Sequence, residues 1–222
     1  VVIRDGVTTI GQYAFYNCNS LTGDLMIPNS MTSIGNDAFN GCSGLSGTLT
    51  LSNQLTTIGT GAFNGCSGLT GHVVTPNSVG SLGDYSFYGC TSISELTIGE
   101  GEGTIGDYSF WNCPSLATVH FNAVNCTEMN TYISYNNYLS VFNSVALDTG
   151  SPAIVTLTLG DNVNRIPNYA FKNSIEMEGG VTIPNNVTNI GTESFCNCSG
   201  LTDPLVLSNR LSVIGPSAFS GC

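Results

Sequence analysis

One short motif recurs along the chain at a nearly constant interval, and this recurrence limits the fold more than any other feature. Residues 10–18 read IGQYAFYNC, and seven further segments repeat this pattern with few changes. The copies begin at Ile10, Ile34, Ile58, Leu82, Ile105, Ile166, Ile190 and Ile214. Their spacing is 24 residues, apart from one interval of 23 and one of 61. Such a period is typical of a solenoid, in which every repeat forms one coil that stacks on the next.

A second pattern predicts one short strand in each coil. Three-residue stretches with mostly apolar first and last residues recur with the same period, as expected of half-buried strands. They lie at 1–3, 25–27, 49–51, 73–75, 96–98, 119–121, 157–159, 181–183 and 205–207. Stacked parallel strands are about 4.8 Å apart, so the middle residues should form one outward row. This row consists of Met26, Thr50, Val74, Thr97, His120, Thr158, Thr182 and Val206.

The other repeated positions predict how each coil closes. The Phe of each copy should fill the interior from the wall opposite the strand, and the small Ala or Ser before it should let neighbouring coils approach. The Gly that follows most of the Ile residues predicts a tight turn with positive φ. Between the Phe and the next strand the chain is short and rich in Gly, so at most one helical turn is expected there.

Residues 27–42, IPNSMTSIGNDAFNGC, resemble the repeat unit of the BspA-like leucine-rich repeat family. The resemblance rests on eight concordant copies and covers nearly the whole chain except about 122–156. It implies an α/β leucine-rich-repeat solenoid, with a parallel sheet of one short strand per coil and with turns or single-turn helices on the other face. It also implies a surface-exposed or secreted protein of host-associated bacteria that binds host proteins or other cells.

The charge balance argues against polyanionic partners. The chain has 15 acidic and only 4 basic residues, a formal net charge of −11. The basic residues lie far apart in the sequence, at Arg4, Arg165, Lys172 and Arg210. A phosphate backbone is bound by clustered cations, so neither nucleic acid nor an anionic membrane surface is an expected partner. No apolar run approaches the roughly 20 residues that span a bilayer, so no membrane insertion is expected within this segment.

No set of residues in the sequence predicts catalysis or a bound metal. His72 and Glu95 fall side by side in adjacent predicted strands, but no nucleophile accompanies them, so a surface ion pair is the simpler interpretation. Acidic residues recur in the turn after the Ile-Gly pair, at Asp37, Asp84, Asp107 and Glu193. Because no calcium-binding loop motif surrounds them, we expect solvated turn residues. We therefore expect no enzyme activity, no catalytic residue, no metal and no cofactor.

Seven of the nine cysteines hold equivalent places in the repeat, at Cys18, Cys42, Cys66, Cys90, Cys113, Cys198 and Cys222. The favoured interpretation is a column of buried thiols that fill space between coils. The alternatives are disulfides between neighbouring coils or a metal site. The equivalent residue of the sixth copy is Ser174, which a paired or metal-binding column would not easily tolerate.

Aromatic residues provide a first candidate binding surface. Tyr85, Tyr88, Tyr108 and Trp111 occupy equivalent positions in two consecutive coils, so they should lie near one another on the outer side. Tyr13 and Tyr16 occupy the same positions in the first coil. Exposed aromatic side chains are enriched at binding hot spots. Packing of these rings on one another is the interpretation that we favour over binding.

The longest interval between motifs provides a second candidate surface. The predicted strands that end at Phe121 and Leu159 are 38 residues apart, and the motif is missing between them. We place an insertion at about 122–156, because insertions in solenoids emerge as loops and often lie on the binding face. Its candidate binding residues are Tyr132, Tyr135 and Tyr138. In the alternative interpretation, Phe142 replaces the usual interior Phe and the tyrosines only cover an edge.

These patterns predict a single solenoid over residues 1–222. Neither end carries a polar cap, so we expect an excerpt of a longer chain. The expected function is non-enzymatic binding or adhesion, at the cell surface or after secretion, through the strand face or the insertion. The expected partner is a host or extracellular protein or glycan. The alternative is a spacer or self-assembly module without a ligand, which would associate end to end.

Overall fold

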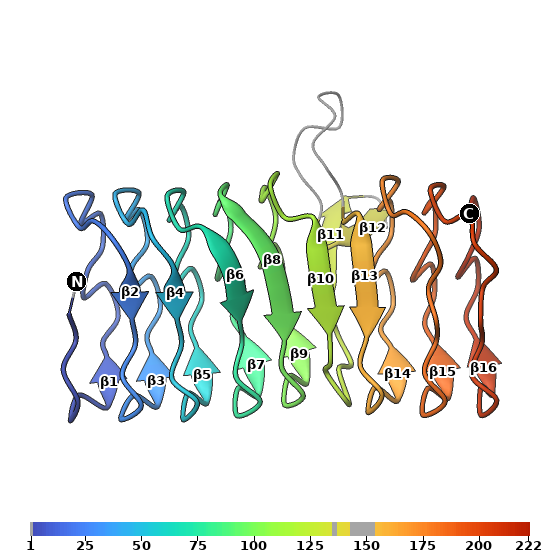
Figure 1. The fold of residues 1–222 in the computed structure, drawn as a ribbon, viewed down its shortest axis with the longest axis horizontal. Helices are drawn as coiled ribbons and strands as arrows, with labels where there is room; N and C mark the ends of the chain where they lie inside the picture. Colours follow the sequence, from blue (N-terminus) through green and yellow to red (C-terminus); the bar gives the residue numbers. More distant parts are fainter. Residues whose placement is uncertain (1, 135–136, 143–153) are drawn as a thin grey trace.

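The computed structural model describes residues 2–134, 137–142 and 154–222, except for the side chains of 130–139. Successive coils stack along one long axis, and the two ends of the chain lie at opposite ends of that axis (Figure 1). Paired strands are close to one repeat apart in sequence, as in the pairing of Thr9 with Ser33 and of Ser33 with Thr57. The solenoid predicted from the repeat is confirmed.

Six of the strands predicted from the alternating triplets form one row along the solenoid. The first two, β2 (Leu25–Met26) and β4 (Leu49–Thr50), pair with each other. The next four form a parallel sheet in the order β13-β10-β8-β6, with bounds β6 (Gly71–Val74), β8 (Ile93–Ile98), β10 (Thr118–Phe121) and β13 (Thr156–Leu159). Nearer the ends of the chain the row continues only as isolated bridges, from Val2 to Met26 and from Thr182 to Val206.

A second row of strands lies where the sequence suggested only a turn. Each of its two-residue strands ends at the first residue of the repeated motif. Five form one parallel sheet: β1 (Thr9–Ile10), β3 (Ser33–Ile34), β5 (Thr57–Ile58), β7 (Ser81–Leu82) and β9 (Thr104–Ile105). Three form another: β14 (Arg165–Ile166), β15 (Asn189–Ile190) and β16 (Val213–Ile214). Turns complete each coil, and the described residues contain no helix and therefore none that could cross a membrane.

A continuous column of phenylalanine rings fills the interior. Neighbouring rings stack nearly parallel, with centroids between 4.9 and 6.1 Å apart. The column consists of Phe15, Phe39, Phe63, Phe87, Phe110, Phe142, Phe171, Phe195 and Phe219. The ring spacing is close to the separation of hydrogen-bonded strands, about 4.8 Å. Ring stacking and backbone pairing therefore favour the same coil geometry.

The irregular coil keeps this column intact. Phe142 is 7% exposed, and its ring stacks between Phe110 at 5.7 Å and Phe171 at 6.1 Å. The interpretation in which Phe142 replaces the usual interior ring is therefore confirmed. The first part of the predicted insertion is also regular, because Glu128 bridges to Thr104 of the preceding coil and Met129 is buried.

The hairpin of β11 (Asn130–Ser134) and β12 (Asn137–Ser140) holds part of the extra chain. Met129 holds the place that Ile105 holds in the preceding coil. The next ring of the column, Phe142, follows Met129 by 13 positions, whereas Phe110 follows Ile105 by only 5. The antiparallel hairpin lies within this longer stretch, beside the regular coils (Figure 1). The insertion is thus an excursion from a regular coil and does not interrupt the stack.

In most coils after the first, the Gly at the second position of the motif is required by close contact with the preceding coil, not by positive φ as we predicted. A Cβ on Gly35 would lie 2.7 Å from the backbone nitrogen of Gln12, in the preceding coil. Positive φ occurs instead two and six residues later, at Asp37 with 53° and Gly41 with 76°. The prediction was wrong because the backbone of the neighbouring coil, which the sequence does not show, occupies the space of a side chain.

The repeated cysteines are free thiols, and most of them are buried, as the space-filling interpretation predicts. Cys42, Cys66, Cys90, Cys113 and Cys198 are at most 4% exposed. Each donates its S–H group to the backbone oxygen of the Phe in the preceding coil or its equivalent, with Sγ–O distances between 2.9 and 3.2 Å. Burial raises the pKa of Cys113 and of Cys198 to about 12, so these groups remain neutral thiols.

Removing one ring from the middle of the column should cost more stability than removing one from its end. Phe63→Ala opens a cavity between two stacked neighbours, and such a change lowers the free energy of unfolding by about 3–5 kcal/mol. The matched control is Phe15→Ala, because Phe15 is partly buried and stacks on Phe39 alone. Its loss should be about half as large. Urea denaturation measures both values, and equal losses would contradict the role of the column.

Thiol burial predicts selective alkylation of the folded protein. Iodoacetamide at about pH 8 should modify the exposed Cys222 and leave Cys90 and Cys113 unmodified, because a buried neutral thiol is not a nucleophile. Denaturant should make all of them reactive. Mass spectrometry of peptides identifies the modified residues. Equal rates for Cys90 and Cys222 in the folded protein would show that the thiols are not sealed between coils.

Candidate functional site

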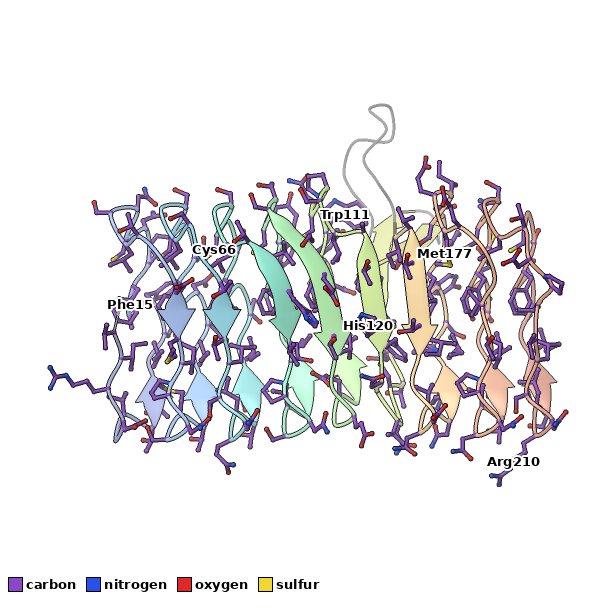
Figure 2. The ribbon with its side chains drawn as sticks, viewed as in Figure 1. Phe15, Cys66, Trp111, His120, Met177 and Arg210 are labelled. Atoms are coloured by element: carbon purple, nitrogen blue, oxygen red, sulfur yellow. The ribbon has the colours of Figure 1, made fainter. Side chains whose placement is uncertain are left out.

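The outward face of the four-stranded sheet carries both histidines of the chain around one glutamate. The register pairs His72 of β6 with Glu95 of β8, and His120 of β10 with Thr97 of β8. His120 Nε2 lies 3.0 Å from Glu95 Oε1, and His72 Nδ1 lies 3.6 Å from the same oxygen. These three side chains are between 32% and 41% exposed, so the arrangement is open to solvent. His120 is marked on this sheet in Figure 2.

Threonine hydroxyls complete this group, which we call the histidine cluster: His72, Glu95, Thr97, His120 and Thr158. His72 Nε2 is 2.8 Å from Thr97 Oγ1, and His120 Nδ1 is 2.6 Å from Thr158 Oγ1. The two imidazole centroids are 6.2 Å apart. Each of the four ring nitrogens thus faces an oxygen, and this fixes both rings relative to the sheet.

The contact predicted between His72 and Glu95 is present at 3.6 Å, but the closer histidine is His120. Sequence reasoning missed this contact because the register places His120 opposite Thr97, two residues along the strand from Glu95. A diagonal neighbour in a sheet is still within reach of a long side chain. The register of these strands was predicted correctly. The sequence did not show that the His120 side chain reaches diagonally to Glu95.

The histidine cluster can donate and accept hydrogen bonds, and its chemistry suits recognition. The groups beside the imidazoles are hydroxyls and one carboxylate, and no Ser, Cys or Lys nucleophile belongs to the cluster. Within the described part of the chain, no group of three or more His, Cys, Asp and Glu side chains is arranged to hold a metal ion. The geometry thus offers a polar contact surface.

The first set of predicted aromatic residues is brought together. Tyr85 and Tyr108 stack with ring centroids 4.8 Å apart, and Tyr88 lies 5.7 Å from Tyr85. Trp111 packs edge-on against Tyr108 at 5.3 Å. Tyr85 is 39% exposed, but Trp111 is only 5% exposed, so the expectation that Trp111 faces outward is wrong. Its indole is large enough to be enclosed by its neighbours, whereas Tyr85 remains accessible for binding.

Several of these tyrosines have a backbone conformation that is unusual for a residue other than Gly. The φ angles of Tyr13, Tyr85 and Tyr108 are 60°, 56° and 60°. Such values are uncommon for bulky residues and often mark functional sites. Here the equivalent residues Asp37, Glu193 and Ser217 share the conformation, with φ between 51° and 53°. The geometry therefore belongs to the coil and is not by itself a sign of function.

The predicted tyrosines of the insertion are only partly covered by the structure. The backbone of the hairpin pairs Tyr132 of β11 with Tyr138 of β12. The side chains of these two residues lie outside the described part of the molecule, and Tyr135 lies outside the described residues altogether. All three remain predicted binding residues.

The acidic turn residues serve mainly local roles. Asp84 Oδ1 accepts a hydrogen bond from the backbone nitrogen of Asp107 at 2.8 Å, and Glu193 Oε2 pairs with Lys172 Nζ at 2.6 Å. Burial, followed by the charges of Asp84 and Glu128, raises the pKa of Asp107 above its ordinary value. The expectation of solvated turn residues is met by the exposed Asp84, whereas Asp107 and Glu193 are partly buried.

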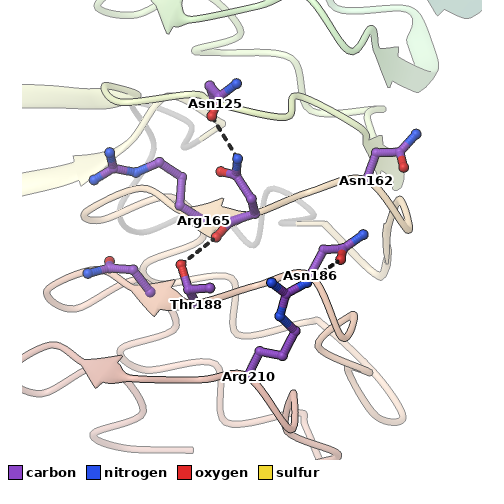
Figure 3. A pocket seen from close by; sticks show the side chains of 8 residues that line it. Asn125, Asn162, Arg165, Asn186, Thr188 and Arg210 are labelled. Carbon is purple, nitrogen blue, oxygen red and sulfur yellow. Dashed lines mark hydrogen bonds between the residues drawn. The ribbon is translucent and has the colours of Figure 1, made fainter.

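A polar hollow of about 550 Å³ opens between the segment just before the hairpin and the coils that follow it (Figure 3). We call it the asparagine groove, and its lining consists of Asn125, Asn162, Asn164, Arg165, Asn186, Thr188, Asn189 and Arg210. Sequence reasoning missed it because cation clustering was judged along the chain. Arg165 and Arg210 are 45 positions apart, but the solenoid places them only two coils apart. A comparison of equivalent positions in successive repeats is the signal that reveals the groove.

One carboxyl group is buried without a partner. Glu102 is fully buried, and neither carboxyl oxygen has a hydrogen-bond partner among the described residues. The Thr75 side chain and the Glu102 backbone oppose the effect of burial on the pKa, but neither is placed to satisfy the carboxyl oxygens. Burial raises the pKa of Glu102 to about 8, so this group is largely protonated at neutral pH.

Glu102 should make the protein less stable as the pH rises. The folded pKa of about 8 lies above the ordinary value of 4.5, so the folded state retains a proton that the unfolded state loses. Its contribution is therefore fully present below about pH 4.5 and is lost progressively up to about pH 8. Glu102→Gln should raise the free energy of unfolding by about 2–3 kcal/mol at pH 7, and by less than about 1 kcal/mol at pH 5.

Urea denaturation at both pH values measures this difference. The matched control is Glu176→Gln, because Glu176 is an exposed carboxyl group. If both variants have the same pH dependence as the unmodified protein, Glu102 is ionised in the folded state and the assignment is wrong.

Comparison with known proteins gives a consistent family and fold. The family model of the BspA type leucine rich repeat region matches residues 8–140 and 142–222, in 6 copies. No curated protein is significantly similar to the chain. Among solved structures, the T. pallidum leucine rich repeat protein TpLRR is 26% identical with a TM-score of 0.58, and the match covers 90% of this chain and 74% of that one.

Two further solved structures cover the whole of this chain. A leucine-rich repeat protein from Bacteroides ovatus is 22% identical, with a TM-score of 0.48 and 70% of its own chain covered. A leucine rich cell surface protein from Faecalibacterium prausnitzii is 22% identical, with a TM-score of 0.39 and 71% of its own chain covered.

Proposed function

This chain belongs to the BspA-type leucine-rich repeat family, and we propose that it is a non-enzymatic binding protein. In this proposal it is displayed on a bacterial cell surface or secreted, and it binds an extracellular protein or glycan. Leucine-rich repeat regions are typically non-catalytic, and the histidine cluster has no accompanying nucleophile. Functions on such a fold depend on surface sites, so the outward side chains are the place to look for them.

The main support is the ordered polar surface on the four-stranded sheet. The side chains of the histidine cluster are not needed for the hydrophobic core, yet they are held in place by hydrogen bonds to one another. A surface that is already ordered loses little conformational entropy when a partner binds. The partly exposed side chains and the parallel strands beneath them form a broad polar contact area, which suits a macromolecular partner.

Disrupting this face should abolish binding to a macromolecular ligand. The purified chain is tested for binding to immobilised fibronectin, laminin, collagen and a panel of glycans. Thr97→Arg places a long charged side chain in the middle of the histidine cluster, and we expect it to weaken any binding by about tenfold or more. The matched control is Ser199→Arg, which makes the same charge change at an exposed turn and should have no effect. Equal affinities of the two variants would remove the sheet face from the proposal.

The predicted residues of the insertion form a second arm of the same experiment. A variant with Tyr132, Tyr135 and Tyr138 changed to Ala tests the hairpin as an alternative contact surface. Loss of binding in this variant, with full binding by Thr97→Arg, would move the site from the sheet to the hairpin. Binding that survives both changes would exclude both surfaces.

The alternative proposal is a spacer or self-assembly module without a ligand. If the unmodified chain binds no ligand and its mass in light scattering rises with concentration, the alternative is the better proposal.

A further inference from the structure

The asparagine groove brings together half of the few basic residues in an acidic chain. Arg165 of β14 and Arg210, in the turn before β16, both line it, whereas the formal net charge of the chain is −11. Another basic residue, Lys172, pairs with Glu193 outside the groove. The residues that line the groove include no carboxylate. The groove is therefore a local site for a negative charge on a protein that otherwise repels anions.

Arg165 is held in the groove wall at an energetic cost. Its Nε atom is buried and has no hydrogen-bond partner among the described residues. A buried donor without an acceptor costs stability, and unsatisfied polar groups in folded proteins are concentrated at sites with another role. Because this Nε atom is buried, a ligand in the groove can pair only with terminal Nη atoms of the guanidinium group, and these suit the oxygens of a carboxylate or a sulfate.

The asparagine side chains around the arginines are fixed in place and keep free hydrogen-bonding capacity. Asn164 Nδ2 donates to Asn125 Oδ1 at 2.7 Å, and Arg210 Nη1 donates to Asn186 Oδ1 at 3.3 Å (Figure 3). At the rim, Asn162 Nδ2 donates to Glu100 Oε1 at 2.9 Å. A side-chain amide has two N–H donors and two acceptor positions, so each of these contacts leaves others for a ligand.

These features select a class of ligand. Sugar hydroxyls donate and accept hydrogen bonds, as amides do, and the arginines supply the counter-charge for one acidic group. The lining has no aromatic or aliphatic anchor of the kind that peptides use. A long polyanion is disfavoured by the net charge, and a hollow of about 550 Å³ is within the size range of small-molecule sites.

We propose that the asparagine groove binds a short acidic oligosaccharide, with the carboxylate or sulfate paired with Arg210 and with the charge of Arg165 adding to the attraction from the other side of the groove (Figure 3). The inference rests on the proposed binding function and specifies a second site for it, away from the histidine cluster. It gives the chain a glycan-binding site independent of any partner on the sheet face.

Titration calorimetry with short sugars tests this proposal. Sialyllactose and a glucuronate disaccharide supply a carboxylate, a sulfated disaccharide supplies a sulfate, and lactose is the neutral reference. We expect at least one acidic sugar to bind about tenfold more tightly than lactose. Arg210→Gln should weaken that binding by about tenfold, because it removes one of the two cations. The control is Arg4→Gln, the same change at an exposed arginine outside the groove.

A second measurement does not depend on the stability of a variant. In the unmodified protein, the Nε–H resonance of Arg210 should shift on addition of the acidic sugar and not on addition of lactose. Equal binding by Arg210→Gln and Arg4→Gln, equal affinity for lactose, or no saturable binding of any acidic sugar would overturn the proposal. Tighter binding of an acidic hexapeptide than of every sugar would assign the groove to peptides instead.

Different results would contradict the binding role of the sheet face and the glycan site in the asparagine groove. Thr97→Arg changes the sheet face and should leave acidic-sugar binding unchanged, because the histidine cluster and the groove share no residue. Loss of matrix-protein binding with intact sugar binding would contradict only the role of the sheet. Intact macromolecular binding in Arg210→Gln, without any sugar binding by the unmodified chain, would contradict only the groove.

Discussion

The structure depends on a match between two spacings, that of stacked phenylalanine rings and that of hydrogen-bonded strands. The rings follow one another at 4.9 to 6.1 Å, and paired parallel strands are separated by about 4.8 Å. Because both interactions run along the same axis, a coil that satisfies one also satisfies the other. Phe142 shows how strict this requirement is, since it restores the ring in a coil that lacks the rest of the motif. The hairpin is accommodated outside the column.

With the interior committed to this repetition, variation is confined to the outward positions. The same strand position carries Thr97 in one coil, His120 in the next and Thr158 in the one after it; His120 is hydrogen-bonded to Thr158, and Thr97 to His72 of the preceding strand. In the turns before the second row of strands, Asn164 and Thr188 are likewise linked from coil to coil. The two candidate surfaces therefore arise in the same way. Each is a line of equivalent positions that differ in side chain while the backbone beneath them stays the same.

This division explains which features could be predicted from the sequence. The Phe and Cys residues recur at fixed spacing, so their burial follows from the repeat alone. The two-residue strands such as β3 show no alternation, and the function of Gly35 depends on the backbone of Gln12 in another coil. The burial of Trp111 and the contact of His120 with Glu95 depend on how far side chains reach across coils. Local pattern predicts the interior, whereas contacts between coils decide the details of the surface.

The direction of the hydrogen bonds has a mechanical consequence. Strand pairs such as β8 with β10 bond from coil to coil, and these bonds point along the long axis of the solenoid (Figure 1). Tension between the two ends of the chain therefore pulls each ladder open instead of shearing it. Since each coil contacts mainly its neighbours, coils would detach one after another. Under load, the molecule would lengthen in small steps at modest force and dissipate energy as a tether does.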